Sequence, residues 1–122
     1  MANPNTWPFN PRLFLKLARY LGESEDEERL RTAVGRAYYA VFLVAYQKLG
    51  ITAIKDVHGA VIDCLWRRRK TALADKMFRL RNLRGVADYE MIPVNEHDRD
   101  WKNNWIRHEK LVDEVMMALD KL

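Results

Sequence analysis

The sequence contains a single cysteine, Cys64, and a single serine, Ser24. One thiol cannot form an internal disulfide, so the cysteine content does not indicate an oxidising compartment. A lone cysteine in a helical pattern is more often a small core residue than a nucleophile. Ser24 stands where a helix is expected to begin and is interpreted as its cap, which leaves no serine for a Ser-His-Asp triad. Both common kinds of nucleophilic enzyme are therefore disfavoured.

Glycine and histidine are also scarce, and their positions exclude two kinds of site. The five glycines are scattered and none precedes a Lys-Ser or Lys-Thr pair, so there is no phosphate-binding loop. His58, His97 and His108 show no metal-ligand spacing with Cys64, and a structural zinc site needs four ligands. The sequence predicts no metal and no cofactor.

Long hydrophobic runs are absent. The longest uninterrupted apolar run, from Ala37 to Tyr46, has ten residues, whereas a membrane-spanning helix needs about twenty. The first six residues contain neither a basic nor an apolar stretch, so the start of the chain does not resemble a signal peptide. We expect a cytoplasmic protein with no membrane partner, in which the apolar run is a buried helix.

Proline and strand signals are missing from most of the chain. All four prolines lie outside residues 12–92, and no hairpin dipeptide or sustained alternation of apolar and polar residues predicts a strand. Apolar spacing instead predicts helices at about residues 11–21, 24–49, 57–69, 71–86 or a little beyond, and 100–122. We expect an all-α fold, an up-and-down bundle of four to five helices. The chain is interpreted as one domain, residues 1–122, with residues 1–10 as an extended N-terminal arm.

Local patterns refine three of these helices. Leu13, Leu17 and Tyr20 share one side of the first helix. Ser24 and Glu27, three residues apart, predict a capping box at the start of the second. In the last helix, steps of four and three predict a seam that packs on the other helices or in a dimer. The seam consists of Trp101, Trp105, His108, Val112, Val115, Leu119 and Leu122.

Positive charge is concentrated in one region, although the formal net charge is only +4. Residues 67–84 contain eight basic residues and one acid, Asp75. A basic belt of this kind favours phosphate-rich partners, although such a cluster is more often an ordinary solvated helix surface. The belt consists of Arg67, Arg68, Arg69, Lys70, Lys76, Arg79, Arg81 and Arg84.

The most informative motif lies at the end of the fourth predicted helix. Leu73, Met77, Leu80, Arg84 and Asp88 follow one another in steps of three and four, so their side chains share one helix face. If the three apolar residues pack inward, the arginine and the aspartate point toward the same interior or cleft. A charged pair there is costly unless its members pair with each other or serve a function. We therefore interpret this pair as the first candidate for a functional site.

Two other polar positions interrupt apolar helices. Arg36 lies one turn before Tyr39 on the otherwise apolar central helix. We expect its charge to be neutralised by a carboxylate, for which Asp88 and Asp63 are candidates. It is interpreted either as part of a buried ion pair or as a charge aimed at a phosphate in a cleft. His108 on the apolar seam is more often a satisfied core histidine than a catalyst.

Three motifs in order resemble the HEPN superfamily, the higher eukaryote and prokaryote nucleotide-binding proteins, and in particular its small stand-alone prokaryotic members. They are Arg36-Ala-Tyr-Tyr-Ala-Val-Phe, the pair His58-Gly59, and Arg84-Gly-Val-Ala-Asp-Tyr-Glu. The resemblance covers about residues 29–90. It implies an up-and-down helical bundle, a homodimer and, in many members, a metal-independent ribonuclease of a toxin–antitoxin or other defence module with a nucleotidyltransferase partner.

The resemblance also implies which residues form the site. Catalytic families have an arginine followed four to six residues later by a histidine, both contributed by two subunits to a shared cleft. Arg84 matches the arginine, whereas the histidine window holds Tyr89, Glu90 and Met91. The candidate catalytic residues are thus Arg84, Asp88 and Tyr89, and the candidate residues for RNA or nucleotide binding are Arg36, Tyr39, His58 and Arg81. Ribonuclease activity and a non-catalytic role as an interaction or dimerisation module both stay open at this point.

Overall fold

Five α-helices and a short 3-10 helix account for most of residues 9–122, the residues that the computed structural model describes. The predicted N-terminal arm falls almost wholly on residues 1–8, outside the described part. No strand occurs in residues 9–122. The helices are α1 (Arg12–Gly22), α2 (Glu27–Leu49), α3 (Val57–Arg67), α4 (Thr71–Tyr89) and α5 (Trp101–Asp120), with η1 (Glu96–Arg99) between the last two. The prediction of an all-α bundle is confirmed.

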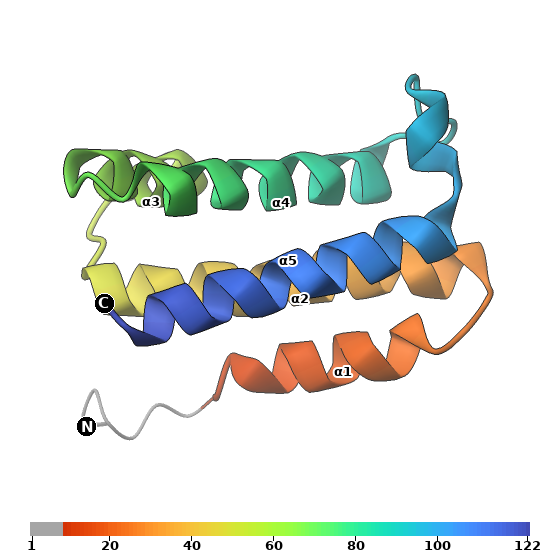
Figure 1. Cartoon of the computed structure of the whole chain (residues 1–122), viewed down its shortest axis with the longest axis horizontal. Coiled ribbons are helices and arrows are strands. Elements are labelled where there is room, and N and C mark those ends of the chain that lie inside the picture. Colours follow the sequence, from red (N-terminus) through yellow and green to blue (C-terminus); the bar gives the residue numbers. More distant parts are fainter. Residues whose placement is uncertain (1–8) are drawn as a thin grey trace.

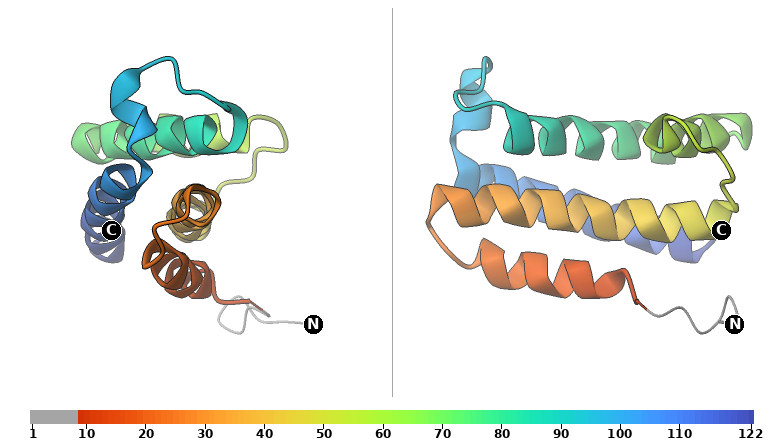
Figure 2. Two further views of the ribbon diagram at one scale, coloured as in Figure 1. Left: turned by 90° about the vertical axis from the view of Figure 1, so that its right-hand side faces the viewer. Right: turned by 180° about the vertical axis from the view of Figure 1, so that it is seen from behind.

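Helices α1, α2, α4 and α5 alternate in direction along the chain. In Figure 1, α1 and α4 run one way and α2 and α5 run the other way, so the packed helices α2 and α5 are parallel. Helix α3, which like α1 has 11 residues, is folded back beside the first turns of α4. Seen end-on in Figure 2, α1 lies on one side of α2 and α5, and α3 and α4 lie on the other. Because each connection is short, neighbours in the sequence are mostly neighbours in space.

The central helix is α2, as its uniformly apolar middle predicted. It contacts each of the other four α-helices. Twelve of its residues are buried, among them Val34, Tyr38 and Val41. A helix that is apolar on all sides can be accommodated only where every side meets another element. Gly50, in the left-handed conformation with φ 62°, ends the helix.

The start of α2 differs from the prediction. The helix begins at Glu27 with Asp26 as its N-terminal flanking residue, and Ser24 instead accepts a hydrogen bond from the Asp26 amide at 2.9 Å. The predicted capping box is therefore wrong. A serine hydroxyl two residues before an amide forms a local turn as readily as a helix cap, and the sequence pattern does not separate these two uses.

The first and last helices pack as amphipathic pieces. Buried Leu15, Ala18 and Gly22 hold α1 on the bundle, so the side that carries Leu13, Leu17 and Tyr20 is the exposed one. The predicted seam of α5 is buried from Trp101 to Leu119, and Leu122 beyond the helix is exposed. None of the helices in residues 9–122 is long and apolar enough to cross a membrane.

Candidate functional site

Arg84 ties the end of α4 to the middle of α2. Its Nε lies 2.9 Å from Asp88 Oδ2, one turn along α4, and its Nη2 donates a hydrogen bond of 2.8 Å to the Tyr39 hydroxyl of α2. The Arg84 side chain is only 17% exposed. Leu73, Met77 and Leu80 on the same face are buried. The arginine therefore points inward, as the stripe predicted.

The Arg84 guanidinium nevertheless retains bonding capacity. The Nε–H does not point at the nearby carboxylate, so Nε is buried without a hydrogen bond. Nη1 makes no hydrogen bond with residues 9–122. A guanidinium has five N–H donors in a fixed fork, and oxygens of a phosphate match that geometry. The Asp88 carboxylate neutralises part of the charge without occupying every donor.

Aromatic rings surround this arginine. The Arg84 Cζ lies 5.1 Å from the centre of the Tyr39 ring and 5.6 Å from that of Tyr89, which is 74% exposed. The Arg36 guanidinium also lies 5.2 Å from the Tyr39 ring and equally close to the Phe14 ring of α1. Each contact stabilises a cation against a ring face. Tyr39 thus contacts two arginines.

The predicted carboxylate partners of Arg36 are wrong. Asp88 pairs with Arg84, and Asp63 pairs with Arg67 of its own helix. Within residues 9–122, Arg36 makes no ion pair and rests on rings instead. A guanidinium is weakly hydrated and stacks well on aromatic faces, so such a site satisfies it without an acid.

His58 joins this group from the start of α3. Its Nδ1 lies 2.7 Å from the Tyr38 hydroxyl, and its ring stacks on Phe42 with centroids 4.2 Å apart. The His58 ring is also 6.1 Å from the Tyr39 ring, edge to face. Burial, followed by the charges of Arg81 and Arg84, lowers the pKa of His58 from its usual value. Burial raises the pKa of Tyr38 to about 12, so this phenol stays neutral.

The glycine after His58 has a local structural reason. Asp56 precedes α3 in the left-handed conformation, with φ 45°, and its Oδ1 accepts a hydrogen bond of 3.1 Å from the Gly59 amide. A Cβ at position 59 would lie 2.3 Å from Asp56 Oδ2, so only glycine leaves room for this cap. The same Asp56 Oδ1 lies 3.5 Å from Arg81 Nη2. The cap of α3 is thereby linked to α4.

The structure brings all seven predicted site residues into one neighbourhood between α2, the start of α3 and the second half of α4. We call this set, with Tyr38 and Asp56 added, the Arg84 cluster: Arg36, Tyr38, Tyr39, Asp56, His58, Arg81, Arg84, Asp88 and Tyr89. Three guanidinium groups in it face two carboxylates. The cluster therefore has an excess of positive charge beside several aromatic faces.

Arg31 supports the cluster and was not singled out from the sequence. Its guanidinium donates to the carbonyl oxygens of Val86, Ala87, Glu90 and Met91, the Glu90 bond being 2.6 Å long, and stacks on Trp101 at 4.5 Å. Val86 and Ala87 lie in the last turn of α4, and Glu90 and Met91 directly follow the helix. Arg31 thus stabilises the end of α4, which continues to Tyr89, a little beyond Val86 as predicted. The stripe Arg31, Gly35, Tyr38 and Phe42 on α2 is the signal that could have revealed it.

Gly35 on that stripe faces Asp88. A Cβ at Gly35 would lie 3.4 Å from Asp88 Oδ1, so the small residue lets the carboxylate approach α2 closely. The Arg84–Asp88 pair consequently lies against the central helix, and its exposure is limited by that contact.

His108 has a different role from His58. It is buried, its Nε2 lies 3.0 Å from the Val34 carbonyl oxygen of α2, and burial lowers its pKa to about 4. A neutral imidazole that donates Nε2–H to a carbonyl is satisfied. The interpretation of His108 as a core histidine agrees with this geometry.

The basic belt is not one continuous surface. Four of its members lie in ion pairs with carboxylates: Arg67, Lys76, Arg81 and Arg84. The turn between α3 and α4 contains Arg68, Arg69 and Lys70, and Arg69 has φ 61°. Part of the belt is therefore ordinary paired helix surface, and part of it belongs to the Arg84 cluster.

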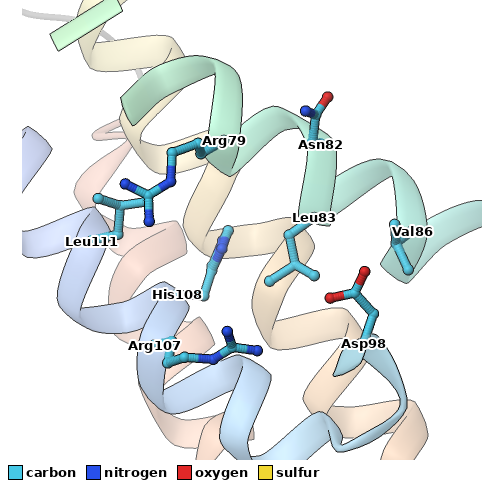
Figure 3. A pocket seen from close by; sticks show the side chains of 8 residues that line it. All are labelled: Arg79, Asn82, Leu83, Val86, Asp98, Arg107, His108 and Leu111. Atoms are coloured by element: carbon cyan, nitrogen blue, oxygen red, sulfur yellow. The ribbon is translucent and has the colours of Figure 1, made fainter. Parts of the chain in front are cut away.

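A separate cavity of about 300 Å³ lies between α4 and α5. Figure 3 shows Arg79 and Arg107 reaching toward it from the two helices, with His108 between them and Asp98 opposite. None of the predicted site residues lines this cavity. It opens between α4 and α5, whereas the Arg84 cluster lies between α4 and α2.

The described residues contain no group of three or more histidine, cysteine or carboxylate side chains that could hold a metal ion. Any chemistry at the Arg84 cluster would rest on guanidinium, imidazole, phenol and carboxylate groups. Such groups bind anionic oxygens, stack on flat ring systems and transfer protons. In comparisons with known proteins, no family model, no curated protein and no solved structure matches this chain.

Proposed function

We propose that this is a HEPN-like protein that binds the phosphate of RNA or of a nucleotide at the Arg84 cluster. The observation that carries the proposal is the Arg84 side chain, which is largely buried and bonded to α2 while Nε and Nη1 make no hydrogen bond with residues 9–122. Burying the Arg84 guanidinium costs desolvation free energy, and a charged group held at such a cost is a candidate for a functional role. Phosphate oxygens are ligands that such a fork binds with charge-assisted hydrogen bonds.

The neighbours of Arg84 favour a nucleic-acid ligand over a simple anion. Arg81 pairs only loosely with Asp56, at 3.5 Å, and Arg36 has no carboxylate partner in residues 9–122. Tyr89 presents an exposed ring beside Arg84. Positive charge tracks the phosphates of a strand, while aromatic faces stack its bases. The Arg84 cluster has both the positive charge and the aromatic faces.

The catalytic form of this proposal is a metal-independent ribonuclease. In RNA cleavage without a metal, one group stabilises the charge that develops on the phosphate oxygens and another takes the proton of the 2′-hydroxyl. Arg84 suits the first role. As a HEPN-like toxin-type enzyme the protein would act in the cytoplasm, as a homodimer, with a nucleotidyltransferase as its partner in a defence module.

Binding of labelled single-stranded RNA to the purified full chain tests the proposal. We expect Arg84→Ala to weaken binding at least tenfold, about 1.4 kcal/mol. Arg12→Ala is the matched control, because it also removes one arginine that has one carboxylate partner, Asp120, but on α1, away from α4 (Figure 1). Binding of the wild-type protein should fall steeply with salt. Equal affinity of the two variants, or binding that ignores salt, would contradict the proposal.

Cleavage is tested separately with the same RNA in the presence of EDTA. We expect wild-type protein to cut the RNA and Arg84→Ala to lose this activity, with Arg12→Ala unaffected. Equal cleavage by wild type and Arg84→Ala would assign the activity to a contaminant and end the catalytic form, while leaving the binding test standing.

A second candidate is a non-catalytic helical interaction or dimerisation module. The observation that favours it is the exposure of apolar side chains directly after α4: Met91, Ile92 and Val94, next to exposed Tyr89. Larger apolar surfaces of this kind are typical of protein contacts. In this case the Arg84–Asp88 pair is architectural, and Tyr89 would be a residue that the nucleotidyltransferase partner docks on or modifies.

Thermal melting separates the two candidates. If Arg84→Ala and Asp88→Ala both lower the melting temperature steeply and RNA does not bind, the pair serves the fold and the interaction module is favoured. If both variants melt like the wild type and RNA binding falls in Arg84→Ala, the cluster is a binding site.

A further inference from the structure

We propose that His58 is the group that takes the proton of the 2′-hydroxyl when RNA is cleaved at the Arg84 cluster. The inference rests on the proposed function and names a catalytic residue for it. The sequence has no histidine in the window of four to six residues after Arg84, so the proton acceptor has to come from elsewhere in the chain.

The fold leaves one histidine beside Arg84. His108 of α5 is buried against α2, and its Nε2 lies within hydrogen-bond distance of the Val34 carbonyl oxygen. His97 lies in η1, exposed, with no contact to the cluster among the described interactions. His58 alone lies against the Tyr39 ring, on whose hydroxyl Arg84 is anchored. The imidazole and the guanidinium therefore flank the same tyrosine.

The His58 ring is held in a fixed orientation. Nδ1 lies 2.7 Å from the Tyr38 hydroxyl. The ring also packs nearly parallel to the rings of Phe42 and Tyr38, with centroids 4.2 Å and 5.6 Å away. Nε2 makes no hydrogen bond with residues 9–122. One nitrogen is thus oriented by a second group and the other has no partner in the described residues, which is the arrangement a general base requires.

The surroundings of His58 keep it unprotonated. The charged and titratable groups that face it are Tyr38 and Tyr39 on α2, Asp56 before α3, and Arg81 and Arg84 on α4. Burial and the two arginines lower the pKa of His58, and only Asp56 acts in the opposite direction. At neutral pH the imidazole is therefore neutral. In the tautomer with the proton on Nδ1, Nδ1–H donates to the Tyr38 oxygen and Nε2 carries the free lone pair.

The proposed step conserves atoms and charge. The 2′-oxygen of the RNA attacks the adjacent phosphorus, and its proton passes to His58 Nε2. The bond between phosphorus and the 5′-oxygen of the next nucleotide breaks, and water protonates that leaving oxygen. The hydroxide so formed takes the proton back from His58. The products are a 2′,3′-cyclic phosphate and a 5′-hydroxyl, and Arg84 stabilises the phosphate oxygens on the way.

The test compares His58→Asn with wild type on a single-stranded RNA and on the same strand with 2′-deoxy nucleotides. Asparagine places an amide near the position of Nδ1, so the contact to Tyr38 is kept while Nε2 is removed. We expect the cleavage rate at saturating protein to fall about 10²- to 10⁴-fold, far more than the RNA affinity falls, and no cleavage of the deoxy strand. The wild-type rate should rise with pH through the lowered pKa of His58 and then level off, and His58→Asn should lack this rise.

Chemical rescue provides a second measurement that does not depend on the asparagine. Added imidazole should restore part of the cleavage by His58→Ala but none by Arg84→Ala. Tyr38→Phe should retain the base, lose its orientation, and reduce the rate by a smaller factor than His58→Asn.

The outcomes separate the inference from the function on which it rests. If wild type cleaves RNA, Arg84→Ala does not, and His58→Asn cleaves like wild type with the same pH profile, the inference about His58 is wrong and the ribonuclease stands. If wild type binds RNA through Arg84 but cleaves none, the inference is equally wrong and the binding function stands. If His58→Ala is inactive and imidazole restores nothing, His58 is a structural partner of Tyr38.

Discussion

Helix α2 contacts two histidines, and the two regions differ in how completely their polar groups are used. At the contact with α5, His108 is fully enclosed and makes one hydrogen bond to the Val34 carbonyl oxygen. At the contact with α3 and α4, His58 lies among arginines, tyrosines and carboxylates that have unused donors and open ring faces. The first region is satisfied within the chain. The second has capacity left for something outside it.

This difference distinguishes architecture from a site by physical criteria. A buried polar group with one sufficient partner stabilises a single packing, and nothing further is needed to explain it. A largely buried guanidinium whose Nε and Nη1 make no hydrogen bond with residues 9–122 is not explained by packing alone. Four predictions, from the largest expected effect to the smallest, test whether the two regions really differ in this way.

The largest effect is expected in the α5 region. Trp105→Ala should lower the free energy of unfolding by about 3–5 kcal/mol, because it empties a large volume in the core. Trp66→Ala is the matched control, since Trp66 is 52% exposed on α3 and should lose far less. Urea denaturation followed by circular dichroism measures both. Similar losses would show that the α5 region is not the more tightly packed one.

The second prediction concerns the pH dependence of stability. The unfolded chain protonates His108 near pH 6.5, whereas the folded chain does so only near pH 4. The unfolded state therefore binds more protons between these values, and the free energy of unfolding falls as the pH is lowered, by about 3 kcal/mol from pH 7 to pH 4. His108→Gln should flatten the unfolding profile by that amount. His97→Gln, at an exposed position, is the matched substitution control, and a profile in His108→Gln as steep as that of the wild type would refute the assignment.

The third prediction tests the link between the two regions. Arg31 bonds to the end of α4 and stacks on Trp101 of α5. Arg31→Ala should lower the free energy of unfolding by about 1–3 kcal/mol, because it removes charge-assisted hydrogen bonds to backbone carbonyls. Arg29→Ala, which loses only an exposed 4.0 Å pair with Asp26, should change it by less than about 0.5 kcal/mol. Equal effects in an unfolding titration would mean that Arg31 does not stabilise the end of α4.

The smallest effect on stability is expected in the Arg84 cluster. Asp88→Asn should change the free energy of unfolding by at most about 1 kcal/mol, because the Asp88 side chain is partly exposed. RNA affinity should instead rise about fivefold, because a negative charge near the phosphate is removed, at a cost in water of about 1 kcal/mol at 4 Å. Asp120→Asn, beside Arg12 and away from α4, is the charge-matched control. A large loss of stability in Asp88→Asn would make this region architectural like the other.

Much of the fold could be predicted because it depends on local patterns. The helical spacing in α4 and α5 and the absence of proline determined which segments are helical and which faces are buried. The same spacing indicated that Arg84 turns inward with Leu80. The capping box at Ser24 was wrong, and the exposure of Leu13 and Leu17 was not foreseen, because both depend on the position of α1 and its loop relative to the bundle.

By itself, the sequence determined the helices, the buried faces of α4 and α5 and the pairing of Arg84 with Asp88, because residues three or four apart meet on a helix whatever surrounds it. The tertiary structure alone decided three contacts. Tyr39 accepts a hydrogen bond from Arg84, the His58 ring packs edge to face on the same tyrosine, and Arg31 donates hydrogen bonds to carbonyl oxygens at the end of α4. These contacts join residues that are 19 to 60 positions apart. Only the packing of α2 against α3 and α4 brings them together, and no local spacing encodes it.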